Sequence, residues 1–362
     1  MRIVVNCRSI MLANRTGIGR YTYHLLDQLG VIDPKNKYLL YAPKKIFDLK
    51  RKLPKFNYPN FTRSISRFGV KVPKGDVYHV PSPSDIERFD GKVLVTVHDM
   101  VYKTYPESHT QQTIEMTEKL MEGIIKRADG IICISESTRT DFHRFFDYPQ
   151  EKSKVVLNGV DHAIFYPLQG PSSAKAFRSD KGIPDEFLLF VGTIEPRKNL
   201  SGLLEAMALL KQKVPLVVVG MKGWMTEDIA PKIKVLGLEG RVIFTGFISD
   251  AELNLLYNMC TAFVFPSFYE GFGFPIVEAF AAGACVVCSS VSSCGEIARD
   301  AAVLIDPHDP VAMAQVLDGL LGDKALIAAY KAKGLRRGGD FSFKKTAQGT
   351  LGVYQALGET RC

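Results

Sequence analysis

The strongest constraint on the fold is a repeated alternation of short apolar runs and helical stretches along the 362 residues. Runs such as 93–97 and 216–219 are rich in Val, Leu and Ile and lack a regular polar alternation. Such runs suit strands of a parallel sheet that is covered on both faces. Strands alternating with helices predict doubly wound α/β domains of about six strands each, with ligands at the carboxyl ends of the strands.

The chain is too long for a single core, so we expect two such domains. Residues 168–185, which contain QGPSS and several charges, are typical of a linker with a short approach helix. We therefore place a first domain at 1–168 and a second at 169–342. Residues 343–357 predict a last helix.

Composition narrows the class of protein. No apolar run of about 18 residues or more is present, so no membrane span is expected. The start, MRIVVNCRSI, is too short an apolar run for a signal peptide and leads into a strand, which favours a cytoplasmic protein. Cys285 and Cys288 have C-x-x-C spacing, but on a buried strand such residues point to opposite faces, which favours a core role over a metal site or disulfide.

Positive charge is concentrated near the start of the chain. The first 75 residues hold 16 Lys or Arg against 3 Asp or Glu, whereas the whole chain is at +8, so the remainder is net acidic. The basic residues gather between 44 and 74 and are mixed with aromatic residues. Such a stretch fits nucleic acid, an anionic membrane surface or a solvated loop face, and composition leaves these interpretations open.

The stretch 262–283 carries two carboxylates at a predicted strand-to-helix turn. AFVFP predicts a buried strand, Pro275 suits the first turn of a helix, and Gly283 suits its end. Glu270 lies in the loop, and Glu278 follows eight positions later. A helix N-terminus attracts phosphate, whereas carboxylates repel it and accept hydrogen bonds from hydroxyls. The combination favours a nucleotide sugar as the ligand. The alternative for Glu278 is a solvent-facing helix carboxylate with no ligand.

Two cations, Arg197 and Lys198, follow a predicted strand at 187–191 and precede a predicted helix from about Leu200. Asn199 or Ser201 can cap that helix. Cations beside a helix N-terminus form a compact site for a diphosphate. A solvated basic pair is the alternative, but the position after a strand argues for a ligand.

Two strand ends of the first domain also carry candidates. His98 follows the strand at 93–97, and the pattern Gly17-Ile18-Gly19 precedes an amphipathic helix. A lone His is usually structural and a lone G-x-G is a weak phosphate signal, but both lie where this architecture binds ligands. For Asp99 three roles remain open: orienting His98, capping the next helix, or contacting an acceptor.

The run EGFG…EA…G resembles the signature of the retaining glycosyltransferases of family 4, which have the GT-B fold. The match is strong over 186–307 and looser over 2–167, and in the signature it covers Glu270, Gly271, Phe272, Gly273, Pro275, Glu278, Ala279 and Gly283. The resemblance implies two Rossmann-like, doubly wound parallel-sheet domains that face a central cleft. It also implies that a C-terminal helix at 343–362 crosses back to the first domain.

The resemblance further implies roles for the candidate residues. The catalytic group would be Glu270, His98, Arg197 and Lys198. Arg197 would take the place of an Arg that many members carry where this chain has Thr193. Donor binding would involve Gly17, Gly19, Arg197, Lys198, Phe247, Ile248, Glu270, Gly271, Phe272, Gly273 and Glu278.

In these roles Glu270 would bind the sugar, Glu278 the ribose, and the loop of Phe247 and Ile248 the base. His98 would reach the sugar from the other domain, which requires domain closure. No Asp-x-Asp pattern is present, so neither a metal site nor a cofactor is expected.

The implied function is retaining transfer of a hexose from a nucleoside-diphosphate sugar to a glycan or lipid-diphosphate-linked acceptor. The runs GIGRYTYHLL and GTIEPRKNL resemble bacterial mannosyl- and rhamnosyltransferases of O-antigen and other surface polysaccharides, which favours GDP-mannose or a GDP-deoxyhexose. Residues 44–74 would then meet the anionic inner face of the cytoplasmic membrane, and no nucleic acid is expected. The alternatives are a GT-B sugar-nucleotide epimerase or phosphorylase, and a non-catalytic basic binding protein.

Overall fold

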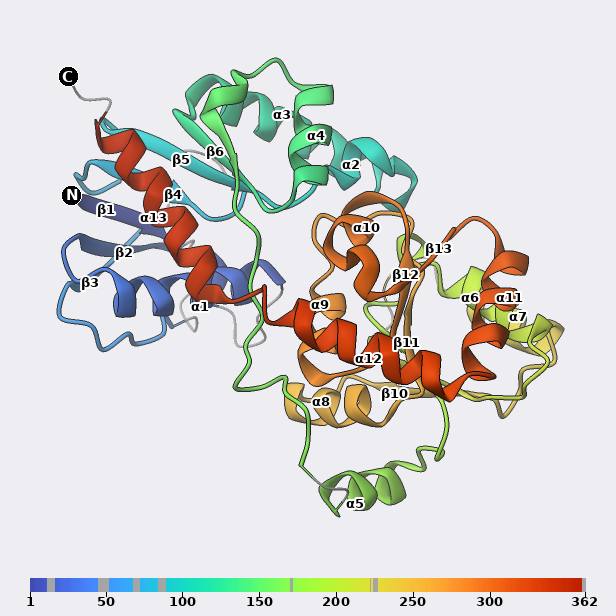
Figure 1. Cartoon of the computed structure of the whole chain (residues 1–362). Coiled ribbons are helices and arrows are strands. Elements are labelled where there is room, and N and C mark those ends of the chain that lie inside the picture. The colour runs from blue at the N-terminus through green and yellow to red at the C-terminus, as the bar shows by residue number, and fades with distance from the viewer. Residues whose placement is uncertain are drawn as a thin grey trace. The chain divides into compact units, whose positions relative to one another are not determined.

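A computed structural model of the chain describes residues 1–11, 17–44, 52–67, 72–83, 89–169, 172–221, 223 and 227–359. The chain divides into two compact units, and each contains one sheet flanked by helices (Figure 1). The first unit comprises Met1–Gly159 and Ser342–Cys362, and the second comprises Val160–Phe341.

The first boundary lies earlier than the expected 168/169, and the second falls before Ser342 rather than before Phe343. The earlier first boundary has a local cause. The backbone N–H of Tyr166 donates to the side chain of Asn254, and that of Leu168 donates to the side chain of Asn258. Residues 160–168 are therefore bonded to the second unit and do not end the first.

The sheet of the first unit has seven parallel strands in the order β3-β2-β1-β4-β5-β6-β7. The strands are β1 (Arg2–Asn6), β2 (Lys37–Lys44), β3 (Phe61–Arg67), β4 (Val77–Val80), β5 (Lys92–Val97), β6 (Gly130–Cys133) and β7 (Ser153–Val155). The described α-helices are α1 (Gly17–Ile32), α2 (Val101–Thr104), α3 (Gln111–Arg127), α4 (Glu136–Phe145) and α13 (Phe343–Glu359).

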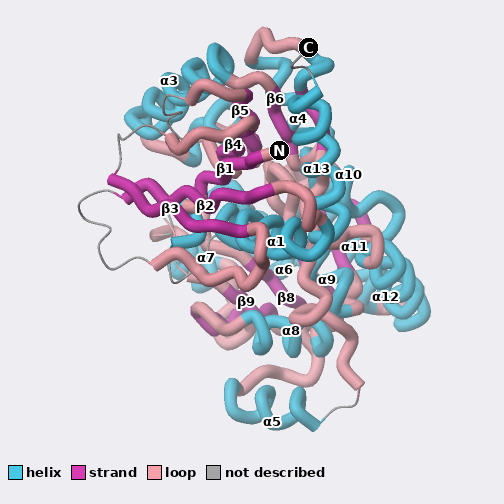
Figure 2. The backbone as a smooth tube through the Cα atoms, turned by 90° about the vertical axis from the view of Figure 1, so that its left-hand side faces the viewer, coloured by secondary structure: helices cyan, strands magenta, loops and turns pink. Residues whose placement is uncertain are grey.

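The expectation of about six strands is wrong for this unit, because β3 lies inside the basic stretch 44–74 and extends the sheet beyond β2 (Figure 2). Its sequence, FTRSISR, has few apolar residues, so an apolar-run criterion misses it. The last strand of this sheet is short and lies at Ser153–Val155.

The C-terminal helix α13 packs on the first unit, against α1, β4 and β6 (Figure 1). The Thr346 hydroxyl donates to the Leu157 carbonyl at 2.8 Å, and the Tyr354 hydroxyl lies 2.6 Å from Nδ1 of His79. Gly159 passes so close to the start of α13 that an added Cβ would lie 2.1 Å from the Phe343 nitrogen. Only glycine fits this crossing of chain segments.

The second unit has a six-stranded parallel sheet in the order β10-β9-β8-β11-β12-β13. The strands are β8 (Leu188–Val191), β9 (Leu216–Val219), β10 (Val242–Gly246), β11 (Ala262–Phe265), β12 (Val286–Ser289) and β13 (Val303–Ile305). The described α-helices are α5 (Ser172–Lys181), α6 (Leu200–Leu209), α7 (Ile229–Val235), α8 (Asp250–Met259), α9 (Phe274–Ala282), α10 (Ser292–Ala298), α11 (Pro310–Leu321) and α12 (Lys324–Gly338).

The strand order of the second unit reverses between β8 and β11. The chain adds β9 and β10 on one side of β8, and then β11, β12 and β13 on the other. Doubly wound sheets bind ligands in the crevice at such a reversal, outside the carboxyl ends of the two strands. The loops that follow β8 and β11 therefore mark the expected ligand edge of this unit.

Buried cysteines contribute to the cores. The six cysteines within the described ranges are all unpaired and buried, and Cys285 belongs to the core of the second unit, as expected for a core role. No cluster of metal-binding side chains occurs among the described residues. Within the same residues, no helix has the length and hydropathy needed to span a membrane.

Candidate functional site

The loop after β8 carries the two predicted cations. A short 3₁₀ turn, Pro196–Lys198, leads into α6, and Asn199 between them has a left-handed φ of 57°. The Asn199 side chain accepts the Gly202 N–H at 3.0 Å and donates to the carbonyls of Pro266 at 3.2 Å and Pro307 at 2.7 Å. Asn199 thereby ties the loops after β8, β11 and β13 together and fixes the backbone beside Lys198.

The loop after β11 carries Glu270, whose backbone is held by the start of α10. The Glu270 N–H donates to the Ser292 hydroxyl at 3.1 Å, and the Ser293 hydroxyl donates to the Glu270 carbonyl at 2.8 Å. Gly273 has a φ of 88°, a left-handed conformation that favours glycine, and turns the chain into α9. Glu270 is 7% exposed, so its carboxylate needs partners within the protein.

Those partners are the predicted cations. Lys198 Nζ lies 2.5 Å from Glu270 Oε1, and Arg197 Nη1 lies 3.0 Å from Glu270 Oε2. Arg197 also contacts Glu195 Oε1 through Nη2 at 2.5 Å and donates from Nη1 to the Tyr269 carbonyl at 2.6 Å. We call Glu195, Arg197, Lys198 and Glu270 the charged cluster. Its formal charges balance, as buried ions require.

The cluster sets the protonation state of Glu270. Burial alone would raise the pKa of this carboxyl, but Arg197 and Lys198 outweigh burial and lower the pKa to about 2. Glu270 is therefore an anion across the physiological range. Burial lowers the pKa of the Lys198 ammonium, and the attraction of Glu270 opposes that effect.

The two helix N-termini at this edge differ. The first turn of α6 is capped by the side chain of Asn199, which occupies one N–H group. The first turn of α9 follows Gly273 and has no side-chain cap, and Pro275 lies in that turn. A helix start whose first N–H groups are not bonded to a capping side chain can bind an anion. In α9, however, Pro275 has no N–H and the Ile276 N–H donates to the Gly273 carbonyl at 3.0 Å, so neither helix start is marked as the phosphate site.

Apart from Gly17 and Gly19, the other predicted donor-binding residues also belong to the second unit. Gly271, Phe272 and Gly273 are buried in the loop that holds Glu270. Glu278, on α9, is 3% exposed and accepts from the Tyr257 hydroxyl at 3.4 Å, so the solvent-facing alternative is wrong. In the loop between β10 and α8, Phe247 is 72% exposed and Ile248 is half-buried, which leaves an aromatic face to the solvent.

His98 lies in the first unit, after β5, and its side chain is buried. Its Nε2 is 2.7 Å from the Pro81 carbonyl, which can only accept, so Nε2 carries the proton and Nδ1 is an acceptor. The Tyr21 ring meets the His98 ring edge-on at 5.1 Å. Burial lowers the pKa of His98, against the opposing effects of the Pro81 bond and Asp99, and keeps the ring neutral at pH 7.

Behind His98 lies a set of neutral polar groups, which we call the neutral cluster: Tyr21, His79, Thr96 and Tyr354. His79 Nε2 lies 2.9 Å from the Thr96 hydroxyl, and Tyr21 contacts the same hydroxyl at 3.2 Å. The bond between His79 and Tyr354 joins this cluster to α13. Burial, followed by the neighbouring His98, lowers the pKa of His79 to about 3.

The predicted glycine loop is not a loop where the structure describes it. Gly17 and Gly19 lie in the first turn of α1, and Gly19 is buried. Thr16, which directly precedes them, falls outside the described residues. Asp99 accepts the Val101 N–H at 3.1 Å, which favours the capping role among its three open roles.

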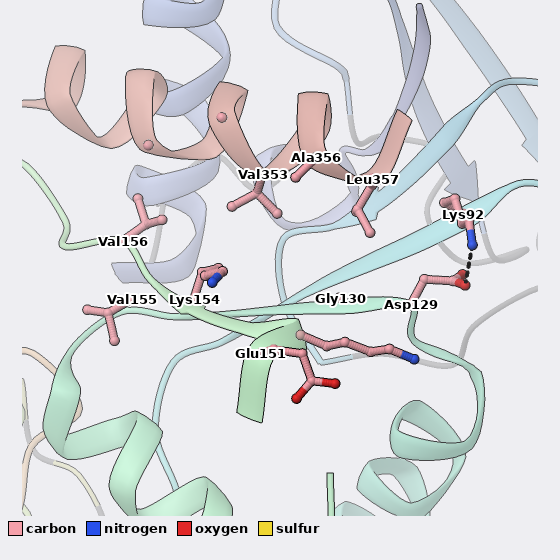
Figure 3. Close-up of a pocket in the computed structure, with 13 residues that line it drawn as sticks. Lys92, Asp129, Gly130, Glu151, Lys154, Val155, Val156, Val353, Ala356 and Leu357 are labelled. Atoms are coloured by element: carbon pink, nitrogen blue, oxygen red, sulfur yellow. Dashed lines mark hydrogen bonds and ion pairs between the residues drawn. The ribbon is translucent and has the colours of Figure 1, made fainter. Parts of the chain in front are cut away.

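A cavity of about 710 Å³ in the first unit is lined by none of the predicted site residues (Figure 3). It is lined by Val353, Ala356 and Leu357 of α13, by the amino ends of β5 and β6, and by β7, and the ion pair Lys92–Asp129 is part of its lining. His98 follows the carboxyl end of β5, at the opposite edge of the parallel sheet. The cavity is therefore separate from the site of His98.

Sequence reasoning brought Arg197, Lys198 and Glu270 to one place, but it did not include Glu195 or the full role of Asn199. Asn199 was expected only as a helix cap. Glu195 lies in the run EPRK, where a carboxylate two positions from an Arg is a signal for an ion pair. The signal was too short-range to distinguish a surface pair from a buried one.

Two family models and several known proteins match the chain. Residues 173–337 match the family model "Glycosyl transferases group 1", and residues 31–164 match "Glycosyltransferase Family 4". The O-antigen chain mannosyltransferase B of Escherichia coli is 28% identical over 373 residues, which cover 94% of this chain and 96% of that protein.

Solved structures share the fold. Sucrose-phosphate synthase of Thermosynechococcus elongatus has a TM-score of 0.78 at 20% identity and covers 99% of this chain and 100% of its own. HepE of Anabaena, solved in complex with UDP-glucose, has a TM-score of 0.73 at 19% identity, with coverage of 99% and 100%. The expected architecture of two doubly wound parallel-sheet domains is confirmed. The chain belongs to the family 4 glycosyltransferases and is a glycosyltransferase with the GT-B fold.

Proposed function

We propose that this glycosyltransferase moves mannose or a deoxyhexose from a GDP-sugar to a glycan or lipid-diphosphate-linked acceptor of a surface polysaccharide, with retention of the anomeric configuration. The observation that carries the proposal is the charged cluster at the reversal between β8 and β11, where two cations meet the carboxylate of Glu270. The full-length similarity to an O-antigen chain mannosyltransferase supports the choice of sugar and pathway.

The cluster fits the charge that develops in such a transfer. Breaking the bond between the anomeric carbon and the phosphate leaves negative charge on the diphosphate and positive charge on the sugar ring. Arg197 and Lys198 would neutralise the former, and one well-placed donor of this kind is worth about 2.7–4 kcal/mol in the transition state. These cations would supply the charge that a divalent metal supplies in other transferases, so we propose a metal-independent reaction.

The carboxylates would serve the hydroxyl groups of the donor. Glu270 is ionised and would accept from sugar hydroxyls or stabilise the cationic ring once the diphosphate draws Lys198 and Arg197 away from it. Glu278, which is buried on α9 and accepts from the Tyr257 hydroxyl at 3.4 Å, would also accept from the ribose. The exposed ring of Phe247 would stack on the base.

His98 would contribute a neutral acceptor. Because Nε2 donates to the Pro81 carbonyl, Nδ1 is left with a lone pair that can accept from a hydroxyl of the sugar. The depressed pKa keeps that lone pair available at pH 7. We therefore propose that His98 orients the sugar and does not act as an acid.

Transfer assays test the proposal. Purified protein is incubated with GDP-mannose, GDP-fucose, UDP-glucose or dTDP-rhamnose and with mannosylated lipid-diphosphate acceptors, and both nucleotide release and sugar product are measured. We expect release that depends on acceptor and is fastest with a GDP-sugar. Interconversion of the donor without acceptor would instead indicate the epimerase alternative, and formation of a sugar 1-phosphate from glycan and phosphate, without nucleotide release, would indicate the phosphorylase.

A basic surface would place the enzyme on its lipid-linked acceptor. Lys52, Lys55, Arg63 and Lys74 belong to the described part of the stretch 44–74. We propose that this stretch contacts the anionic inner face of the cytoplasmic membrane. Co-sedimentation with phosphatidylglycerol vesicles should occur at low salt and be lost at high salt, because screening weakens such contacts. Absence of binding at low salt would refute this part of the proposal.

A further inference from the structure

Glu195 is a buried carboxylate that the predicted site does not include. Its side chain is 5% exposed, and its Oε1 lies 2.5 Å from Nη2 of Arg197. It stands at the end of the loop after β8, immediately before the 3₁₀ turn Pro196–Lys198 that carries the cations. Burying an ion pair rarely adds stability over apolar packing. The burial of Glu195 therefore points to a role in holding Arg197 rather than to a gain in the stability of the fold.

The contacts of Arg197 divide between its two terminal nitrogens. Nη2 contacts Glu195, while Nη1 donates to the Tyr269 carbonyl at 2.6 Å and lies 3.0 Å from Glu270. A guanidinium is planar, so one contact at each terminal nitrogen fixes the orientation of the whole group. Glu195 and the Tyr269 carbonyl thus fix the plane of the Arg197 guanidinium. Glu270 contacts Nη1 of this group and also contacts Lys198.

From this geometry we infer that Glu195 is a positioning residue, which acts through Arg197 and keeps Nη1 aimed at the diphosphate that Lys198 also contacts. The inference rests on the proposed function, because it assumes that Arg197 meets the donor. An anionic ligand competes with carboxylates for the cations. Glu270 holds both cations and would be displaced from them, whereas Glu195 holds the far side of Arg197 and would stay.

This role has a kinetic signature that a purely structural role lacks. Replacing Glu195 with Gln removes a negative charge near the ligand, which favours anion binding, and removes the ionic contact that orients Arg197. We expect GDP affinity to stay within about threefold of wild type while kcat falls about 10- to 100-fold, the usual range when a partner that orients a functional group is lost. A structural role would lower GDP affinity, kcat and thermal stability together.

The test is a double-mutant cycle on the full chain. Glu195→Gln, Arg197→Lys and the double variant are compared with wild type in kcat, donor KM and GDP affinity by calorimetry. Because Arg197→Lys keeps the charge but removes the planar fork, Glu195→Gln should cost less than about threefold in that background. Glu195→Asp, which keeps the charge but shortens the reach, should fall between wild type and Glu195→Gln.

Glu205→Gln is the matched control, since Glu205 pairs with Lys232 on the surface of the same unit. It should leave kcat and GDP affinity unchanged. Equal costs of Glu195→Gln in the wild-type and Arg197→Lys backgrounds, or a parallel loss of GDP affinity and kcat, would overturn the inference. If wild type binds GDP and transfers sugar while Glu195→Gln matches it, the inference fails and the proposed function stands. If wild type neither binds GDP nor transfers sugar, the proposed function fails first.

Discussion

The charged cluster of the second unit and the neutral cluster of the first solve the same problem in opposite ways. Both bury polar side chains in or beside a parallel sheet. The charged cluster keeps Glu270 ionised by placing Arg197 and Lys198 against it, which lowers its pKa to about 2. In the neutral cluster the partners of His79 are the hydroxyls of Thr96 and Tyr354, so burial keeps the ring neutral and lowers its pKa to about 3.

This difference indicates which kind of ligand group each unit can bind. Buried charge persists only beside an opposite charge or a ligand that supplies one. Cations that are already paired with a carboxylate can exchange that carboxylate for a diphosphate. Neutral rings and hydroxyls can only exchange hydrogen bonds, which suits the hydroxyl groups of a sugar.

The largest effect that distinguishes the clusters is expected at Lys198. Lys198→Ala removes the cation closest to Glu270 and should lower kcat about 10²- to 10³-fold, because a positioned charge in a buried site contributes strongly to transition-state binding. Transfer assays with Lys232→Ala, a surface cation of the same unit, provide the control. Normal transfer by Lys198→Ala would show that the charged cluster is not needed for the reaction.

Acid should affect the neutral cluster first. The pKa of His79 is about 3 in the folded chain against 6.5 for the free residue, so between pH 6.5 and 3 the unfolded chain binds a proton that the folded chain does not. Stability should therefore fall with pH in this window, by up to about 1.4 kcal/mol per unit. For Glu270 the corresponding window runs only from 4.5 down to about 2.

Calorimetric scans of wild type and His79→Gln at pH 7, 6 and 5 measure this difference. His79→Gln should lower the melting temperature at pH 7, because it disturbs the bonds to Tyr354 and Thr96, but it should flatten the dependence on pH. An equally steep dependence in the variant would mean that another group titrates in this window.

A smaller effect is expected at His98. His98→Ala removes one neutral hydrogen bond to the sugar, which is worth about 0.5–1.5 kcal/mol, so kcat/KM for the donor should fall about two- to tenfold. GDP affinity should not change, since GDP lacks the sugar. His109→Ala, on the same unit, is the control in the same assays. A loss as large as that of Lys198→Ala would show that His98 does more than accept a hydrogen bond.

The smallest effect is expected at the surface pair of Glu205 and Lys232. Both side chains are partly exposed, and exposed pairs contribute less than about 1 kcal/mol because water screens them. Glu205→Gln should therefore shift the urea midpoint only slightly. A large shift would mean that ion pairs stabilise this unit even where water reaches them, and the contrast with the charged cluster would lose its basis.

The sequence predicted most of the fold because long apolar runs and helix signals agree in it. Gly283 ends α9 with a φ of 80°, and Asn199 caps α6, as their residue types suggest. The strand β3 was missed because its sequence, within a basic stretch, has few apolar residues. A sheet edge of this kind is defined by pairing with β2, a long-range contact that local patterns do not reveal.

The part of the candidate site that lies at the carboxyl ends of the strands could be predicted from the sequence. Parallel strands bring their carboxyl ends to one edge, which places the loops of Lys198 and Glu270 together. The position of Gly17 and Gly19 inside α1 was not predictable from G-x-G, because glycine is tolerated in a first helical turn as well as in a loop. The partner of Arg197 depends on burial, which the sequence alone does not specify.

The claim that Arg197 and Lys198 receive the diphosphate of the donor is tested most directly by calorimetric titration with GDP. Wild type and Lys232→Ala should bind GDP saturably with equal affinity, and Lys198→Ala should bind it at least about tenfold more weakly, since it loses a charge-assisted contact. Equal affinity in wild type and Lys198→Ala would contradict the claim.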